Sequence, residues 1–373
     1  MNANLENNFK LIEHATIDSL KIRILLSNVT ILDTSILDTK TKYIISDSTG
    51  EIMEETKIKH LAKEIKFNAY SIKAAIVSQY NFALKKNIDY LEIYLHSKIL
   101  ETDYFNGITI QNIEAIHTKL MAKKVFDISF ENFLISSVND IDIKKDFLTD
   151  KQSFLDLTTY LKKVATSSNH RHKGAQRYQN GNIEFNTRKT STSTSPFLKL
   201  YDKELEAIER KNEFFDTYFN VNDLRNLKRI EATLKSTKEV KQSLNLETSN
   251  LVSLLNSTPG ELNEVISNAV NINLKAIKEV TIKKSKVERS NNLDKMIYIH
   301  FANMLDNQNL FFEEALAITL EHFTDKQNKF RIKKKIVKIY SEEIAEIEHK
   351  KVNLKRVELL SLIGWGNSKS LYA

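Results

Sequence analysis

The spacing of apolar residues alternates between the two-residue period of strands and the 3.6-residue period of helices up to about residue 235. Alternation of apolar and polar residues over 17–24 predicts a half-buried strand. Similar patterns predict further strands at 71–78, 90–98, 138–147, 182–188, 197–201 and 227–234. Helical spacing predicts helices over 110–124 and 151–164, the latter capped by Asp150, and a charged helix over 202–212. Strands and helices therefore share the first part of the chain.

Beyond about Ser236 the pattern becomes mainly helical. Thr258, Pro259 and Glu261 have the spacing of a helix start, with a capping hydroxyl, a proline at the first position and a returning carboxylate. A chain of 373 residues is long enough for two domains. We expect a boundary within 238–247, which divides the chain into residues 1–238 and a helical part, 239–373, that binds DNA or a partner protein.

Composition excludes several classes of protein. No apolar stretch is long enough to span a bilayer, and the polar first nine residues lack the apolar core of a signal peptide. The absence of cysteine removes disulfides, thiolate zinc sites and cysteine nucleophiles, and it fits a reducing cytoplasm. We expect no membrane partner. The 7 glycines form no phosphate-binding loop, which argues against an ATPase, a kinase or a Rossmann dehydrogenase.

The net charge of +7 favours a polyanionic partner such as DNA, because neutralising phosphates releases counterions. A slightly basic protein with no such partner has the same composition. The most concentrated positive charge lies in 326–338, where contacts with phosphates are expected from Lys333, Lys334, Lys335 and Lys338. The alternative is a solvated helix face, balanced by the glutamates that follow it.

The first candidate for chemistry is the acidic strand at 138–147. On a strand, Asp140, Asp142, Lys144 and Asp146 point to one side. Several carboxylates on one face repel each other unless a cation compensates them, and Mg²⁺ and Mn²⁺ prefer oxygen ligands. The alternative is a solvated acidic face.

The second candidate is Tyr201, which shares a strand face with Lys199 and Lys203. Flanking lysines favour the phenolate, the form that attacks a phosphodiester and holds the cleaved end covalently. The alternative is an ordinary tyrosine at a strand end, since the chain contains 13 of them.

Two further groups lie on either side of this strand. Arg229 could hold a phosphate bidentately, and Glu231 could bind a metal or act as a base. A cross-strand ion pair is the alternative for both. His170 and His172, separated by Arg171, could bind a metal, but their polar, basic loop fits contact with phosphate or simple exposure equally well.

In this order, the segments resemble the rolling-circle replication initiators of staphylococcal-type plasmids and the replication endonucleases of filamentous phages. The likeness is carried over about residues 15–236 by the opening strand, the acidic strand, the basic segment with Arg188 and Lys189, the Tyr201-Asp202-Lys203-Glu204 run and Arg229-Ile230-Glu231. Asp140 stands where a basic residue is common in that family, so either Asp140 or Asp142 could be the acidic ligand. The nucleophile could also be Tyr178 or Tyr218.

The resemblance implies an α+β fold, in which an antiparallel-sheet nicking-closing nuclease domain with flanking helices precedes the mainly helical C-terminal domain. It implies a phosphotyrosine intermediate at Tyr201, Mg²⁺ or Mn²⁺ on Asp142, Asp146 and Glu231, and charge neutralisation by Arg229, Lys199 and Lys203. DNA contacts are expected from Arg188, Lys189, His170 and His172. The implied setting is the cytoplasm of a bacterial host, with a replication origin that is single-stranded at the nick, a host helicase and a possible homodimer.

Two other classes compete with this interpretation. One is a non-enzymatic DNA-binding regulator of replication or copy number with a degenerate nuclease domain. The other is a conjugative relaxase, for which a histidine triad is expected and the 9 scattered histidines give no such pattern. Convergence of Asp142, Tyr201 and Glu231 in space would favour the nuclease.

Overall fold

The computed structural model describes residues 10–45, 52–60, 62–82, 84–167, 175–185, 197–209, 213–273, 296, 299–300, 303–304, 312–321, 323–339 and 345–364. Its centre is a nine-stranded sheet in the order β10-β11-β12-β13-β9-β1-β7-β6-β5, and all neighbouring strands are antiparallel. The strands are β1 (Thr16–Leu25), β5 (Lys63–Lys66), β6 (Ser71–Asn81), β7 (Lys86–His96), β9 (Ser137–Leu148), β10 (Ala175–Arg177), β11 (Ile183–Phe185), β12 (Phe197–Asp202) and β13 (Leu227–Leu234). The expected α+β class with a large antiparallel sheet is confirmed.

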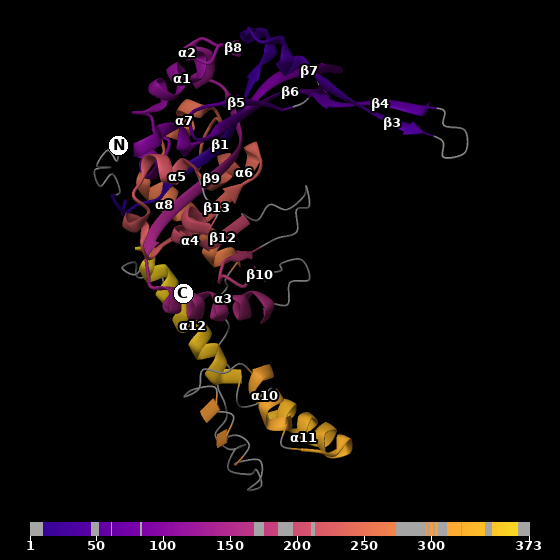
Figure 1. Ribbon diagram of the computed structural model, residues 1–373, viewed down its shortest axis with the longest axis vertical. Helices are drawn as coiled ribbons and strands as arrows, with labels where there is room; N and C mark the ends of the chain where they lie inside the picture. Colours follow the sequence, from indigo (N-terminus) through magenta and orange to yellow (C-terminus); the bar gives the residue numbers. More distant parts are fainter. Residues whose placement is uncertain are drawn as a thin grey trace.

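Most of the sheet follows the alternation in the sequence. The strands predicted at 17–24, 71–78, 90–98, 138–147, 197–201 and 227–234 correspond to β1, β6, β7, β9, β12 and β13. The strand predicted at 182–188 is β11 as far as Phe185, and 186–188 lie outside the described residues. Two small two-stranded sheets were not predicted as strands: β2 (Thr30–Ile31) with β8 (Phe126–Asp127), and the hairpin of β3 (Thr39–Ile45) with β4 (Ile52–His60). The β3–β4 hairpin projects away from the sheet (Figure 1).

The three predicted helices of the first part are also present, as α1 (Ile113–Met121), α3 (Lys151–Ser167) and α4 (Lys203–Glu209). The Asp150 carboxylate accepts a hydrogen bond from the Ser153 amide at 2.9 Å, so it caps α3 as expected. The remaining elements of this part are η1 (Leu26–Asn28), η2 (Thr34–Leu37), η3 (Ser97–Asn106), α2 (Phe130–Leu134), α5 (Glu213–Tyr218) and η4 (Val221–Leu224).

One face of the sheet is apolar and covered by the helices that follow β13. These are α6 (Thr237–Ser243), α7 (Leu251–Leu255) and α8 (Pro259–Asn273). Buried residues of β9 and β13, such as Ile143 and Ile230, form one hydrophobic core with residues of these helices, such as Val240 and Val265. Helix α6, which spans the expected boundary at 238/239, and the later helices α7 and α8 thus share a core with the sheet. The capping box of α8 is present, since the Thr258 amide donates to the Glu261 carboxylate at 2.6 Å.

The opposite face carries the polar residues of the same strands. One end of it is covered by η3 and α5, whose aromatic side chains pack together. This aromatic cluster consists of Tyr104, Phe105, Phe214, Phe215 and Phe219. The rest of the polar face carries two neighbouring hollows. The cluster therefore divides the polar face into a covered end and an open part.

The last described helices are α10 (Phe312–Glu321), α11 (Lys326–Ile339) and α12 (Ala345–Leu362). Helix α12 packs against α3, and α10 and α11 lie at the far end of the molecule from the β3–β4 hairpin (Figure 1). Among the described residues, no helix is both long and apolar enough to cross a membrane.

Candidate functional site

Strand register brings the candidate residues of three strands onto one face. In the β9–β13 ladder Arg229 lies opposite Asp146. In the β12–β13 ladder Glu231 lies opposite Lys199, and Arg229 lies opposite Tyr201. Directly opposed residues on antiparallel strands have side chains within reach of each other. The register therefore determines which charges meet.

The central feature is a carboxylate shared by a phenol and an ammonium group. The Tyr201 hydroxyl donates a hydrogen bond to Glu231 Oε2 at 3.1 Å, and Lys199 Nζ lies 3.0 Å from Glu231 Oε1. Glu231 is 5% exposed, whereas Lys199 and Tyr201 are half-buried. Two of the predicted catalytic residues are thus joined by one of the predicted metal ligands.

The protonation states differ from the expectation for Tyr201. Burial raises the pKa of its hydroxyl well above the ordinary value, and the nearby Glu231 raises it further. The flanking lysines pair with carboxylates: Lys199 bonds Glu231, and Lys203 pairs with Glu206 while its Nζ lies 5.6 Å from the centroid of the Tyr201 ring. Burial, together with the nearby Asp142, also raises the pKa of Glu231. A neutral phenol therefore donates to a carboxylate of increased basicity, which is the geometry of a nucleophile and its general base.

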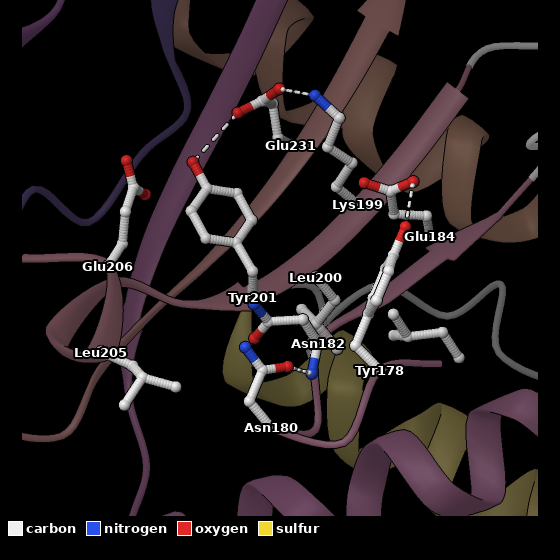
Figure 2. A pocket seen from close by; sticks show the side chains of 11 residues that line it. Tyr178, Asn180, Asn182, Glu184, Lys199, Leu200, Tyr201, Leu205, Glu206 and Glu231 are labelled. Atoms are coloured by element: carbon white, nitrogen blue, oxygen red, sulfur yellow. Dashed lines mark hydrogen bonds and ion pairs between the residues drawn. The ribbon is translucent and has the colours of Figure 1, made fainter. Parts of the chain in front are cut away.

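The pair opens into a hollow of about 440 Å³ between β11 and β12 and the start of α4. Figure 2 shows Tyr201 and Tyr178 on either side of it, with Glu231 and Lys199 between them. Tyr178 donates to Glu184 Oε2 at 3.2 Å, so the hollow contains a second phenol–carboxylate pair. Asn180, Asn182, Ile183, Leu200, Leu205 and Glu206 complete the lining. Tyr218, the other alternative nucleophile, lies in α5 against the aromatic cluster.

Arg229 and Asp146 form a buried bidentate ion pair. Arg229 Nε and Nη2 donate to the two oxygens of Asp146 at 2.6 and 2.9 Å, and Nη1 donates to the Tyr104 hydroxyl at 2.7 Å and to Asp18 at 3.2 Å. Arg229 is 0% exposed, and neither member of the pair lines the open hollows. In the structure, Arg229 therefore forms a cross-strand ion pair, because the strand register places it beside Asp146 under the aromatic cluster.

Asp142 lies apart from Asp146, in a second hollow. Its oxygens accept hydrogen bonds from Ser19 Oγ at 2.6 Å and Thr233 Oγ1 at 2.5 Å, and burial raises its pKa. Within the described ranges, no group of three histidine or acidic side chains is placed to hold a metal ion. Since Arg229 occupies both oxygens of Asp146, the predicted set of Asp142, Asp146 and Glu231 does not fit a metal site in this arrangement.

The sequence did not single out three members of the buried network, Asp18, Tyr104 and Glu206. Lys144 Nζ lies 2.9 Å from Asp18 Oδ1 and donates to the Tyr104 carbonyl at 3.0 Å, while Lys203 pairs with Glu206 at 3.0 Å. Asp18 is hard to find because the β1–β9 register shifts between Ile17 and Ser19. A bulge changes the phase of the alternation, so the period alone assigns Asp18 to the wrong face.

None of the remaining predicted DNA contacts that the structure describes lines either hollow. Arg188, Lys189, His170 and His172 fall outside the described residues. Lys333, Lys334 and Lys338 are exposed on α11, and Lys335 is half-buried there.

In comparisons with known proteins, no family model, no curated protein and no solved structure matches this chain.

Proposed function

We propose that this chain initiates rolling-circle DNA replication by nicking one strand and rejoining it through a covalent bond to Tyr201. The proposal rests chiefly on one observation: the Tyr201 hydroxyl donates to a buried carboxylate, Glu231, at the wall of an open hollow. A sequence resemblance to such initiators points in the same direction.

In the proposed reaction, Tyr201 Oη attacks the phosphorus of a phosphodiester while its proton passes to Glu231 Oε2. The new bond joins the phenolic oxygen to phosphorus, and the bond between phosphorus and the 3′ oxygen breaks. The products are a 5′-phosphotyrosine and a 3′ oxygen that leaves as a hydroxyl with a proton from solvent. Rejoining is the reverse transfer, and the energy of the ester is conserved in the covalent intermediate.

The other predicted catalytic residues have different parts in this scheme. Lys199 lies beside Glu231 and lines the hollow, where its charge can neutralise the negative charge that develops on the phosphate. Arg229 and Lys203 are positioning residues, because both are buried and hold the strands and α4 around Tyr201. A requirement for Mg²⁺ or Mn²⁺, which the resemblance implies, is a separate proposal; because Arg229 holds both oxygens of Asp146, the cation would have to bind without that residue, and no step above depends on it.

The test uses a pool of random single-stranded oligonucleotides labelled at the 3′ end, because the origin sequence is unknown. Nicking by the wild type transfers the label to the protein, and the adduct persists on a denaturing gel. We expect adducts from the wild type and from the matched controls Tyr178→Phe and Tyr218→Phe, and none from Tyr201→Phe. An adduct with Tyr201→Phe refutes the nucleophile, and no adduct with the wild type refutes the nuclease.

One observation favours the alternative of a non-enzymatic DNA-binding regulator. Arg229 and Asp146, two residues implied in catalysis by the resemblance, neutralise each other inside the protein. This alternative predicts that the wild type binds the oligonucleotide pool but never carries label through the denaturing gel.

A further inference from the structure

The second hollow, of about 500 Å³, adjoins the Tyr201 hollow on the same face of the sheet. The two share Lys199 and Glu184 in their linings. The second hollow extends from there across β13 and β9 to β1 and β7, where Tyr94 forms its far wall. An extended ligand whose phosphate is at Tyr201 can therefore continue along this face.

Three lysines line the second hollow, and aromatic rings hold their ammonium groups in place. Lys21 Nζ lies 4.8 Å from the centroid of the Tyr94 ring, and Lys235 and Lys199 lie 4.6 and 5.2 Å from that of Phe197. Within the described part of the chain, Lys21 and Lys235 make no ion pair within 4.0 Å, unlike Lys199. Two cations are thus fixed at the surface with charge available to a ligand.

The carboxylates of the same hollow are mostly occupied by partners. Asp142 accepts from the Ser19 and Thr233 hydroxyls, and Glu184 accepts from Tyr178. A carboxylate that accepts hydrogen bonds inside the protein presents less charge to a ligand.

Asp140 is the exception among these carboxylates. It lies opposite Lys21 in the β1–β9 ladder, and Lys21, Lys199 and Lys235 all surround it. Burial raises its pKa despite the three lysines. It is the one acidic group of the hollow that opposes binding of an anion, which makes it a useful probe.

We infer that the second hollow binds the single-stranded DNA on one side of the nick, with phosphates on Lys21 and Lys235 and a base against Tyr94. The inference rests on the proposed function for the direction of the strand. Tyr94 is 37% exposed and its hydroxyl donates to Glu92 at 3.3 Å, so its ring is held in orientation and is partly accessible beside Lys21. Stacking on an aromatic ring and contact with phosphates are independent of base identity, so we expect binding without sequence preference.

The experiment measures binding of fluorescein-labelled oligo(dT), about 16 nucleotides long, to the full chain by fluorescence anisotropy. All variants are made in the Tyr201→Phe background, so that no adduct contributes. For single strands, each neutralised phosphate contributes about 0.7 to the slope of log affinity against log salt. Lys21→Ala/Lys235→Ala should therefore reduce that slope by about 1.4. Between about 50 and 200 mM salt, the parent should then lose about sevenfold more affinity than the double variant.

Two further variants serve as controls for this result. Lys86→Ala/Lys241→Ala removes the same charge at the distant start of β7 and on α6, and should leave the slope within about 0.3 of the parent. Asp140→Asn removes the opposing charge and should tighten binding. Thermal unfolding followed by circular dichroism shows that each variant folds.

The outcomes separate this inference from the nicking proposal. A parent-like slope in the Lys21→Ala/Lys235→Ala variant overturns the second hollow as the path of the strand, even where the wild type forms the phosphotyrosine adduct. An unchanged or weaker affinity in Asp140→Asn also overturns it. A reduced slope together with tighter binding by Asp140→Asn supports the hollow, even where no adduct forms.

Discussion

The ion pair between Arg229 and Asp146 gives the sharpest test of the site, because its two interpretations predict opposite results. If it is structural, Asp146→Asn leaves a buried guanidinium without its bidentate partner. Removing one member of a buried ion pair lowers the free energy of unfolding by about 3–5 kcal/mol. Asp18 still lies 3.2 Å from Arg229, and Tyr104 accepts one hydrogen bond, so we expect the lower end, about 3 kcal/mol. If Asp146 instead binds a catalytic metal, the same change should abolish nicking without loss of stability.

The assay is urea unfolding followed by circular dichroism, with Asp140→Asn as the matched control. Asp140 lies on the same face of β9 but makes no hydrogen-bonded ion pair within the described residues, so its substitution should change the free energy of unfolding by less than about 1 kcal/mol. Replacing both members by apolar residues, as in Asp146→Leu/Arg229→Met, should recover part of the loss, because no charge is then left unpaired. An Asp146→Asn variant as stable as the wild type would refute the structural interpretation.

Three further predictions concern the chemistry and the backbone. Glu231 must be ionised to accept the phenolic proton, and its pKa is raised, so the nicking rate should rise with pH through a value above the pKa of an ordinary glutamate. Glu231→Gln should remove this pH dependence together with most of the activity. A nicking rate of the wild type that does not change with pH contradicts Glu231 as the base. The proposed requirement for Mg²⁺ or Mn²⁺ predicts that EDTA stops adduct formation and that either cation restores it, whereas adducts formed in EDTA would rule the requirement out. Gly107→Ala should destabilise the fold by about 1–3 kcal/mol in urea unfolding, because Gly107 has a φ of +71° and a Cβ there would lie 2.7 Å from Thr16 Cβ. Gly260→Ala, whose Cβ would meet only Thr258 Oγ1 at 3.8 Å, should be neutral or stabilising, and equal losses for the two variants would contradict the geometry.

The strands could be predicted from the sequence because burial of one sheet face imposes a two-residue period. What the period cannot give is register. On β13, Arg229 and Glu231 point to the same side, and nothing in that strand says which of them meets Asp146. A shift of two residues along the ladder would place Arg229 opposite Lys144 and Glu231 opposite Asp142, so that neither would keep its partner. Asp18 was missed for a related reason, since the bulge in β1 changes the face to which it points.

The helices after β13 show a second limit of the sequence. The residues that begin α8 could be identified because the capping hydroxyl and carboxylate are local signals. The surface that an amphipathic helix covers is set by the rest of the fold, so the change to helical periodicity near 236 suggested a boundary. In the structure, Val240 and Val265 are instead part of the core beneath the sheet.

The division of the polar face explains why the resemblance and the structure assign different roles to similar residues. Charged residues continue along β9 and β13 from one end to the other, but the aromatic cluster covers only the end that contains Asp146 and Arg229. Charges taken from water must pair, and these do so with each other. Two residues further along β13, Glu231 lies at the edge of the open part, where a phenol and an ammonium group share it and a ligand can approach.

Removing the aromatic cover, as in Phe214→Ala/Phe215→Ala, should therefore destabilise the Arg229–Asp146 pair while the Tyr201–Glu231 pair keeps its hydrogen bond. Adduct formation at low temperature, where the variant is still folded, would then persist, and loss of adduct in a folded variant would show that the two ends of the face are coupled.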